Sequence, residues 1–306
     1  MTTPLLPTTE WVFLAGRPPM AEYLGFMSTQ MLEGGTAGQQ QLADEWRAAN
    51  DRVKDLTETE AGLADGAEVD PLPEELLPLA EDVLGEPAYM QSFAVVPTEL
   101  RIVDLNRLVV FQKNINMDYV RELQESLPTD PTIEQVFGFC MAPEGARPPV
   151  RSQQVANNAF VFISPSTDFR FLGADLIPHD QAPTAGATGH PTSVVALPVG
   201  YGSNYLNVVS VNGRLVLNNG SHRAYALRDA GLEKVPAVIQ RITRPEELEV
   251  IGPKAVHANP DPYLQHPRPP LLKDYFDPAL RKVIRIPRRA RQVRITFNVE
   301  SLDIPG

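Results

Sequence analysis

The feature that most constrains this chain is an apolar strand that runs through a glycine turn directly into a helix. Residues 215–217 are hydrophobic, residues 218–220 read Asn-Asn-Gly, and residues 221–227 continue at helical spacing. The first N–H groups of a helix have no partner inside it, and the helix dipole adds partial positive charge at this end. Such a helix start binds phosphate well, so the sequence predicts a phosphate site at residues 220–223.

Four residues of this turn are the predicted phosphate ligands. Gly220 lets the backbone approach a ligand closely, and Arg223 can grip two phosphate oxygens at once. Ser221 opens the helix, and His222 adds a further donor. Spacing alone leaves an equal alternative, in which the turn is a plain strand-to-helix connection. His222 and Arg223 would then pair with the protein's own acids.

Composition narrows the class of protein. The 306 residues carry a net charge of −11, which argues against non-specific binding to nucleic acid. The single cysteine, Cys140, rules out an internal disulfide and a multi-cysteine metal site. There is no apolar run of the roughly 18 residues that a membrane span needs, and residues 1–7 do not read as an export signal. We therefore expect a cytoplasmic protein of bacterial type, with no membrane partner.

The N-terminal part is predicted to be helical. Residues 20–32 and 42–56 have apolar side chains at helical spacing, and the second run resembles a coiled-coil seam. That seam packs either on the chain's own body or on another subunit. Residues 55–86 hold many carboxylates and no Lys or Arg, which is typical of a solvated face. Within them, residues 73–84 are predicted to form a short helix.

The middle of the chain changes to strand patterns. Residues 93–96, 100–105 and 108–111 are predicted strands, and Asn116 is predicted to cap a helix that continues to Leu127. Residues 138–205 are rich in Pro and Gly, with strand-like runs at 159–163 and 193–197 around a predicted loop at 178–191.

Asn212-Gly213 between two apolar runs predicts a hairpin of residues 206–211 and 214–217. The helix after the turn is predicted to stop at Gly231, and residues 235–239 form the next strand. Residues 253–270 are predicted to be a loop. Residues 281–294 are basic, with no acid among them, and residues 293–299 alternate as a final strand.

The motif Asn219-Gly220-Ser221-His222-Arg223 resembles the signature of the ParB/sulfiredoxin superfamily, together with the glycine stop at Gly231 and the Val-Pro strand that begins at Val235. Residues 103–108, 112–116 and 119–127 resemble the first strand, polar loop and helix of that module. The resemblance covers about 93–137 and 206–242.

The resemblance implies an α+β fold with a ParB/sulfiredoxin-like mixed-sheet core at 91–245. That core carries a β-rich insertion at about 138–205. It is preceded by a helical and acidic segment at 1–90 and followed by a Pro-rich, basic extension at 246–306.

The resemblance also implies that the turn holds the phosphates of ATP or CTP, often with magnesium. Gln112, Asn114 and Asn116 would line the wall that faces them. Thiol reductases of the family need a cysteine where Ser221 stands. Its DNA-partition proteins carry a DNA-binding helical domain after the module, whereas the residues that follow Arg241 here are Pro-rich and then basic.

Free-serine kinases of the family use a glutamate in the loop where Gln112 stands, and glutamine cannot act as a general base. Asp104 or Glu122 would then have to hold magnesium or accept a proton. The histidines show no metal-ligand spacing, so no protein-bound metal site is predicted.

Two functions follow. The first is an ATP-dependent phosphotransferase or NTPase that acts on a small molecule or a protein. The alternative is a non-catalytic scaffold or nucleotide switch that self-associates or binds an acidic partner. The basic segment 281–294 would dock on residues 55–86 of its own chain, on another copy or on an acidic protein, while its use on nucleic acid is disfavoured.

Overall fold

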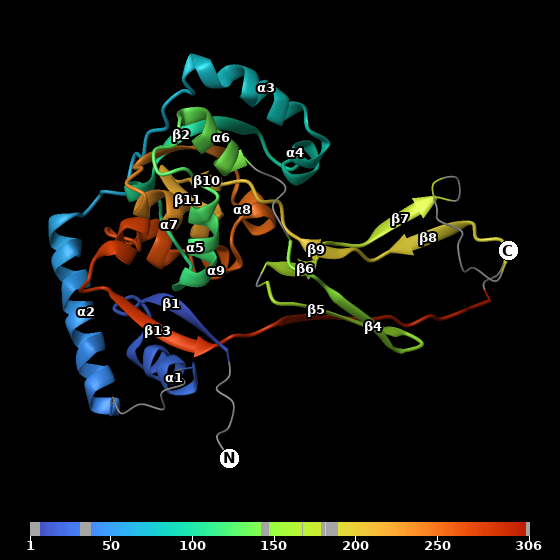
Figure 1. Cartoon of the computed structure of the whole chain (residues 1–306), viewed down its shortest axis with the longest axis horizontal. Coiled ribbons are helices and arrows are strands. Elements are labelled where there is room, and N and C mark those ends of the chain that lie inside the picture. Colours follow the sequence, from blue (N-terminus) through green and yellow to red (C-terminus); the bar gives the residue numbers. More distant parts are fainter. Residues whose placement is uncertain are drawn as a thin grey trace. The chain divides into compact units, whose positions relative to one another are not determined.

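The computed structural model describes residues 7–30, 38–141, 147–166, 168–178, 181 and 189–303. It is a mixed α and β structure with several sheets (Figure 1). The chain forms two compact units. Unit 1 comprises Met1–Glu144 and Asn204–Arg288, and unit 2 comprises Gly145–Ser203 and Arg289–Gly306.

Unit 1 is built around a four-stranded sheet of order β11-β10-β12-β2. Strand β10 pairs antiparallel with β11 and parallel with β12, and β12 pairs antiparallel with β2. The connection between β11 and β12 is helix α7 (Ser221–Asp229). The strands are β2 (Thr98–Asp104), β10 (Asn207–Val211), β11 (Arg214–Asn219) and β12 (Lys234–Arg241).

Local sequence explains this centre. Asn212 and Gly213 take the left-handed backbone conformation that a tight hairpin turn needs, with φ of 52° and 76°. Gly231, at φ 88°, follows the last turn of α7 and ends the helix, as predicted. The predicted strand at 235–239 is confirmed within β12.

Helices and the sheet of unit 1 share one apolar core. Asn116 caps α5 as predicted, because its side-chain oxygen accepts from the N–H groups of Asp118 and Tyr119. Other helices that contribute to this core include α3 (Leu77–Gly85), α4 (Pro87–Ser92), α5 (Met117–Glu125) and α6 (Ile133–Met141), with the 3-10 helix η1 (Glu74–Leu76) ahead of α3.

A second, three-stranded sheet of unit 1 joins distant parts of the chain. Its order is β13-β1-β3, formed by β1 (Thr8–Leu14), β3 (Asn114–Asn116) and β13 (Arg281–Pro287). Helices α1 (Met20–Gln30) and α2 (Gln39–Thr59) pack beside it. The helical pattern predicted both helices but missed β1 and β13. Leu42, Ala49 and Leu56 of the predicted seam are buried within the chain itself.

Several local predictions need correction. Residues 93–96 are not a strand, because Phe93 ends α4 and Pro97 restricts the residue before it. Residues 108–111 form only isolated bridges through Val109. Short helices occupy much of the predicted loop 253–270, with prolines at their starts. The remaining elements of unit 1 are α8 (Pro245–Ile251), α9 (Lys254–Ala258), η2 (Leu105–Arg107), the π-helix η4 (Asp261–Gln265) and η5 (Leu272–Phe276).

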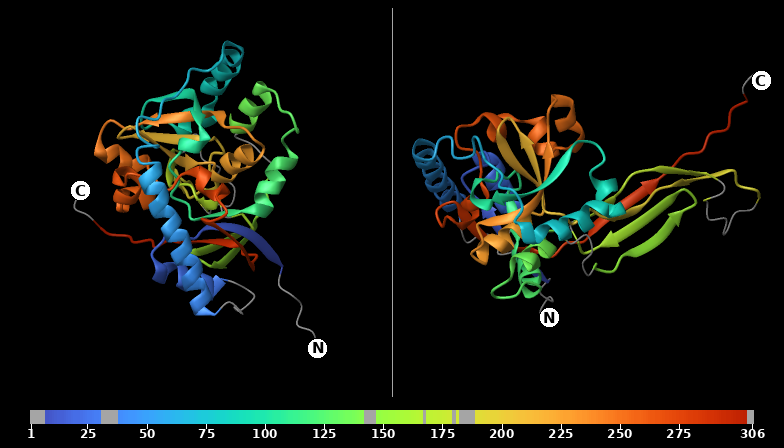
Figure 2. Two further views of the ribbon diagram at one scale, coloured as in Figure 1. Left: turned by 90° about the vertical axis from the view of Figure 1, so that its left-hand side faces the viewer. Right: turned by 90° about the horizontal axis from the view of Figure 1, so that it is seen from above.

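Unit 2 consists of small antiparallel sheets. Strands β4 (Arg151–Ala156), β5 (Ala159–Ser164) and β14 (Arg291–Thr296) form a three-stranded sheet of order β14-β5-β4. Figure 2 shows β14 running beside β5, although about 130 residues separate them in sequence. Two further pairs are β6 (Phe169–Phe171) with β9 (Val199–Tyr201), and β7 (Asp175–Pro178) with β8 (Ser193–Ala196). Most of the predicted 178–191 loop lies outside the described residues.

Within the described ranges, no helix has both the length and the apolarity that crossing a membrane requires.

Candidate functional site

The turn before α7 has the predicted backbone geometry. Gly220 has φ 88°, a conformation that side chains disfavour, and is the N-cap of α7. A Cβ atom added there would lie 2.9 Å from Leu206 Cδ1 and 3.3 Å from Leu206 Cα. The glycine is therefore required by a close approach to Leu206 of the protein's own core.

Arg223 points into unit 1. Its side chain is only 7% exposed, and its Nη1 donates to the carbonyl oxygens of Cys140, at 3.3 Å, and of Asn204. The guanidinium carbon lies 5.5 Å from the centre of the Phe139 ring. Cys140 is in the last turn of α6 and Asn204 precedes β10. Arg223 thus joins the two segments of unit 1 between which the chain passes through residues 145–203.

The charge of Arg223 is not balanced by an acid in the described structure. No ion pair of the described residues includes it, and its Nε is buried without a hydrogen-bond partner. Burial lowers the pKa of the guanidinium, which still remains the cationic side chain of this turn.

His222 is brought together with Asn116, as the predicted facing wall requires. Its Nε2 accepts a hydrogen bond from the backbone N–H of Asn116 at 3.0 Å, and its ring meets Tyr119 edge-on at 5.3 Å. Burial lowers the pKa of His222 to about 4. The imidazole is therefore neutral at neutral pH and acts as a hydrogen-bond acceptor.

We expect His222 to make stability depend on pH. Its folded-state pKa is about 4, below the roughly 6.5 of an unfolded histidine. The unfolded chain therefore binds the extra proton first, and stability falls as pH drops from about 6.5 to about 4, by on the order of 2–3 kcal/mol. Urea denaturation at a series of pH values across this range should show a shallower fall in stability for His222→Gln than for the wild type. Equal falls in the two proteins would contradict the assignment.

The other wall residues lie in or beside β3. Asn116 also accepts from the Thr9 hydroxyl at 2.9 Å, and Asn114 pairs with Phe13 across the sheet. The backbone carbonyl of Gln112 accepts from the Tyr275 hydroxyl at 2.6 Å, while its side-chain oxygen is buried without a partner. The segment 112–116 is thus held in place mainly by contacts inside unit 1.

The two carboxylate candidates lie elsewhere. Asp104 ends β2, and its side chain accepts from the N–H of Asn106 at 2.8 Å. Asn106 in turn accepts from Arg228, near the C-terminal end of α7, whereas the glycine turn is at the N-terminal end. Glu122 is exposed on α5. Neither carboxylate has a described hydrogen bond to residues 220–223.

Two hollows of the described structure lie away from residues 220–223. One, of about 250 Å³, lies between the β10–β11 turn and η4. The other, of about 590 Å³, is lined by Arg52, Leu63, Asp104, Asn106, Arg107, Arg228, Lys273, Phe276, Asp277 and Pro278.

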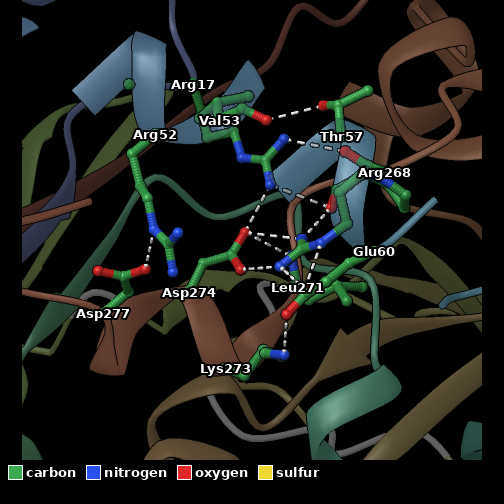
Figure 3. Close-up of polar contacts among 12 residues, drawn as sticks. Arg17, Arg52, Val53, Thr57, Glu60, Arg268, Leu271, Lys273, Asp274 and Asp277 are labelled. Carbon is green, nitrogen blue, oxygen red and sulfur yellow. Dashed lines mark hydrogen bonds and ion pairs between the residues drawn. The ribbon is translucent and has the colours of Figure 1, made fainter. Parts of the chain in front are cut away.

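A buried ion cluster, drawn in Figure 3, is linked to the second hollow through Lys273, which lines that hollow and pairs with Glu60. Asp274 is 1% exposed and binds Arg17 at 2.7 Å and Arg268 at 2.6 Å. Arg268 has no exposed side-chain surface and also binds Glu60 at 3.0 Å. The cluster joins the segment after β1, the end of α2 and η5. The sequence does not predict this cluster, since no local pattern brings residues 17, 60 and 274 together.

In unit 2, strands β5 and β14 place apolar side chains on one face of their sheet, whereas β4 places Ser152 and Gln154 there. Phe162 lies opposite Val293, and Phe160 lies opposite Ile295, so these side chains share one face. All four are partly exposed, and Phe297 stacks on Phe160 at 6.3 Å. The signal in the sequence is the alternation along 293–299, which predicts a strand but does not identify its partner.

The basic segment 281–294 spans β13 and most of β14. Lys282 pairs with Glu45 of α2, and Arg288 pairs with Asp118 of α5 at 3.5 Å. These two side chains therefore bind acids outside the predicted docking segment 55–86.

The described ranges contain no cluster of three or more His, Cys, Asp or Glu side chains that could bind a metal ion. Burial raises the pKa of Cys140 to about 12, so its thiol stays protonated.

Comparison with known proteins finds no matching family model, curated protein or solved structure.

Proposed function

We propose that this chain is a non-catalytic scaffold that self-associates through the three-stranded sheet of unit 2. The observation that carries this proposal is the partly exposed apolar face that β5 and β14 form in that sheet. Among the described residues of unit 2, the buried ones are Ala159, Ser164, Gly202 and Phe169. A sheet of few strands with so little interior needs a packing partner for stability.

The strand edges support the same proposal. In the order β14-β5-β4, no further strand of the described residues pairs with the outer edge of β14 or of β4. Exposed edges and apolar faces are where another chain adds most readily. Val150, just before β4, and Val155, within β4, add further exposed apolar surface, at 39% and 46% exposure.

Charge favours a second copy as the partner. Unit 1 holds 21 Lys and Arg against 33 Asp and Glu, whereas unit 2 holds six against five. On η1 and α3 of unit 1, the acids Glu74, Glu75, Glu81 and Asp82 are all exposed. Between and after them lie the exposed side chains of Leu77, Leu84, Met90 and Val95.

Strand β14 supplies the complementary surface. It carries Arg291 and Arg294, with Arg289 just before it, together with the apolar side chains of its sheet face. An acidic and apolar surface on unit 1 thus matches a basic and apolar surface on unit 2. Because the two surfaces differ, we propose a head-to-tail contact between copies.

We expect Ile295→Glu to disrupt self-association. A carboxylate on the apolar face would be buried without a partner, which should weaken association at least about tenfold. Sedimentation velocity over a concentration series measures this change. Thr296→Glu is the matched control, because it adds the same charge on the opposite face at an exposed position, and its association constant should stay close to that of the wild type.

Salt tests the ionic part of the proposal. Added salt should weaken self-association, because exposed ion pairs are screened. An oligomer that ignores salt would contradict charge matching, and a wild-type chain that stays monomeric at high concentration would contradict self-association itself.

We propose further that the core sheet of unit 1 is of the ParB/sulfiredoxin type, in which the glycine turn has become structural. Three features of the turn support this role. Gly220 packs on Leu206, His222 accepts from the backbone of Asn116, and Arg223 binds two backbone carbonyls.

A second function, nucleotide binding at residues 220–223, is favoured by one observation. Arg223 is a buried cation whose Nε lacks a partner, and an anionic phosphate would balance its charge. Titration with labelled ATP and CTP, with and without magnesium, separates the possibilities. Turnover that is lost in Arg223→Ala supports an enzyme, binding without turnover supports a nucleotide switch, and no binding supports the scaffold.

A further inference from the structure

We infer that the hollow of about 590 Å³ beside η2 is a binding site for a phosphate monoester. The inference concerns unit 1 alone and is independent of self-association through unit 2. The volume is within the range of small-ligand sites in proteins. Two groups of observations support the inference. The first is the set of charged side chains that line the hollow, and the second is the set of hydrogen-bond partners of those side chains.

The lining is locally positive in a negative unit. Four cations face the hollow from separate elements, Arg52 of α2, Arg107 of η2, Arg228 of α7 and Lys273 of η5. Two carboxylates, Asp104 and Asp277, face it as well. Unit 1 as a whole has 12 more acids than basic residues, so this excess of cations is a local feature that attracts anions.

The closest hydrogen-bond partners of Arg107 and Arg228 are oxygens that carry no charge, although Arg228 also lies 3.5 Å from a carboxylate oxygen of Glu233. Arg107 donates to the backbone carbonyls of Leu63, at 3.0 Å, and of Asp65, at 2.8 Å. Arg228 donates to the side-chain oxygen of Asn106 at 2.7 Å. Such bonds fix the direction of a guanidinium without neutralising it, which is the preparation that binding an oxyanion requires.

The other charges around the hollow are more nearly balanced. Arg52 pairs with Asp277 at 2.9 Å, and Lys273 pairs with Glu60 at 2.8 Å. Glu233 approaches Arg228 at 3.5 Å but is 61% exposed, so solvent screens this pair. Asp104 is engaged by the N–H of Asn106. Arg107 and Arg228 therefore keep the largest uncompensated charge.

The rest of the lining selects the ester over the free anion. The Phe276 ring lies 5.6 Å from the guanidinium carbon of Arg228 and offers an apolar surface beside it. The carboxylates of Asp104 and Asp277 have further lone pairs that can accept hydrogen bonds from hydroxyl groups of a ligand. A phosphate group between Arg107 and Arg228 would place the organic part of the ester beside Phe276. Hydroxyl groups on that organic part would then reach Asp104 and Asp277.

Isothermal titration calorimetry of the full chain with inorganic phosphate and with glycerol phosphate, at low salt, tests the inference. We expect one site per chain and tighter binding of the ester. Arg107→Gln and Arg228→Gln should each weaken binding about tenfold or more, because each removes a charge-assisted contact. The matched control is Arg47→Gln, an exposed change on α2 that should leave affinity within about twofold.

A variant that is expected to bind phosphate more tightly serves as a further test, because a rise in affinity cannot result from unfolding. Asp277→Asn removes a carboxylate from the lining and releases Arg52, so phosphate should bind several-fold more tightly. Equal affinity in wild type, Arg107→Gln and Arg228→Gln would overturn the inference. So would binding that is lost only in Arg223→Met, since it would place the anion at the glycine turn. Sedimentation of Arg228→Gln should match the wild type, which separates this test from that of self-association.

Discussion

We expect Asp274→Asn to destabilise the folded chain by about 3–5 kcal/mol. The substitution removes the carboxylate that two arginines share, and Arg268 has no exposed side-chain surface through which water could solvate it. Breaking a buried ion pair by removing one partner leaves a buried charge without compensation, which explains the size of the effect. Glu60 still binds Arg268 and compensates part of its charge, so we expect the variant to remain folded in the absence of urea.

Urea denaturation measures this effect, with Asp44→Asn as the control. Asp44 also pairs with an arginine, Arg47, but their side chains are 60% and 52% exposed. Exposed pairs contribute little, so the control should stay within about 0.5 kcal/mol of the wild type. A loss below about 1 kcal/mol in Asp274→Asn would show that the cluster does not hold α2 and η5 to the body of unit 1.

The second large effect is expected at Arg223. Arg223→Met keeps an unbranched side chain of similar length but removes the donors that bind the carbonyls of Cys140 and Asn204. Two buried carbonyl oxygens would lose their charged donor, which destabilises the folded state. Removing the guanidinium also removes the cost of its burial, which offsets part of this effect. We therefore expect the free energy of unfolding to fall by about 2–4 kcal/mol.

Arg214→Met provides the comparison for Arg223→Met. Arg214 is also almost fully buried, but it binds a carboxylate, that of Asp65, at 2.6 Å. Hydrogen exchange locates the expected change, since Arg223→Met should loosen the end of α6 and the start of β10, whereas Arg214→Met should loosen the β10–β11 hairpin and the segment near residue 65. An Arg223→Met protein as stable as the wild type would indicate that the arginine is kept for a ligand.

Local patterns predicted the centre of the fold well. Asn212-Gly213, the cap at Asn116 and the glycine stop at Gly231 each act within a few residues, so sequence alone specifies them. The backbone of the glycine turn was predictable for the same reason. Its φ of 88° follows from Gly220 between a strand and a helix.

Long-range pairing was not predictable in the same way. Strand β1 pairs with β13, and their register places Thr8 opposite Pro287 and Leu14 opposite Arg281. The local sequence of either strand does not indicate which strand is its partner. The direction of the Arg223 side chain has the same origin, because its partners lie 83 and 19 residues away in sequence. The apolar face of unit 2 appears only once the β5–β14 register is known.

Hydrogen exchange as a function of protein concentration tests the central claim most directly. If copies associate through unit 2, the amides of β14 and β4, at the sheet edges, and the exposed surface of η1 and α3 should gain protection together as concentration rises. The β10–β11 hairpin, buried in unit 1, should exchange equally at all concentrations. Identical exchange of unit 2 in dilute and concentrated wild-type protein would contradict the account.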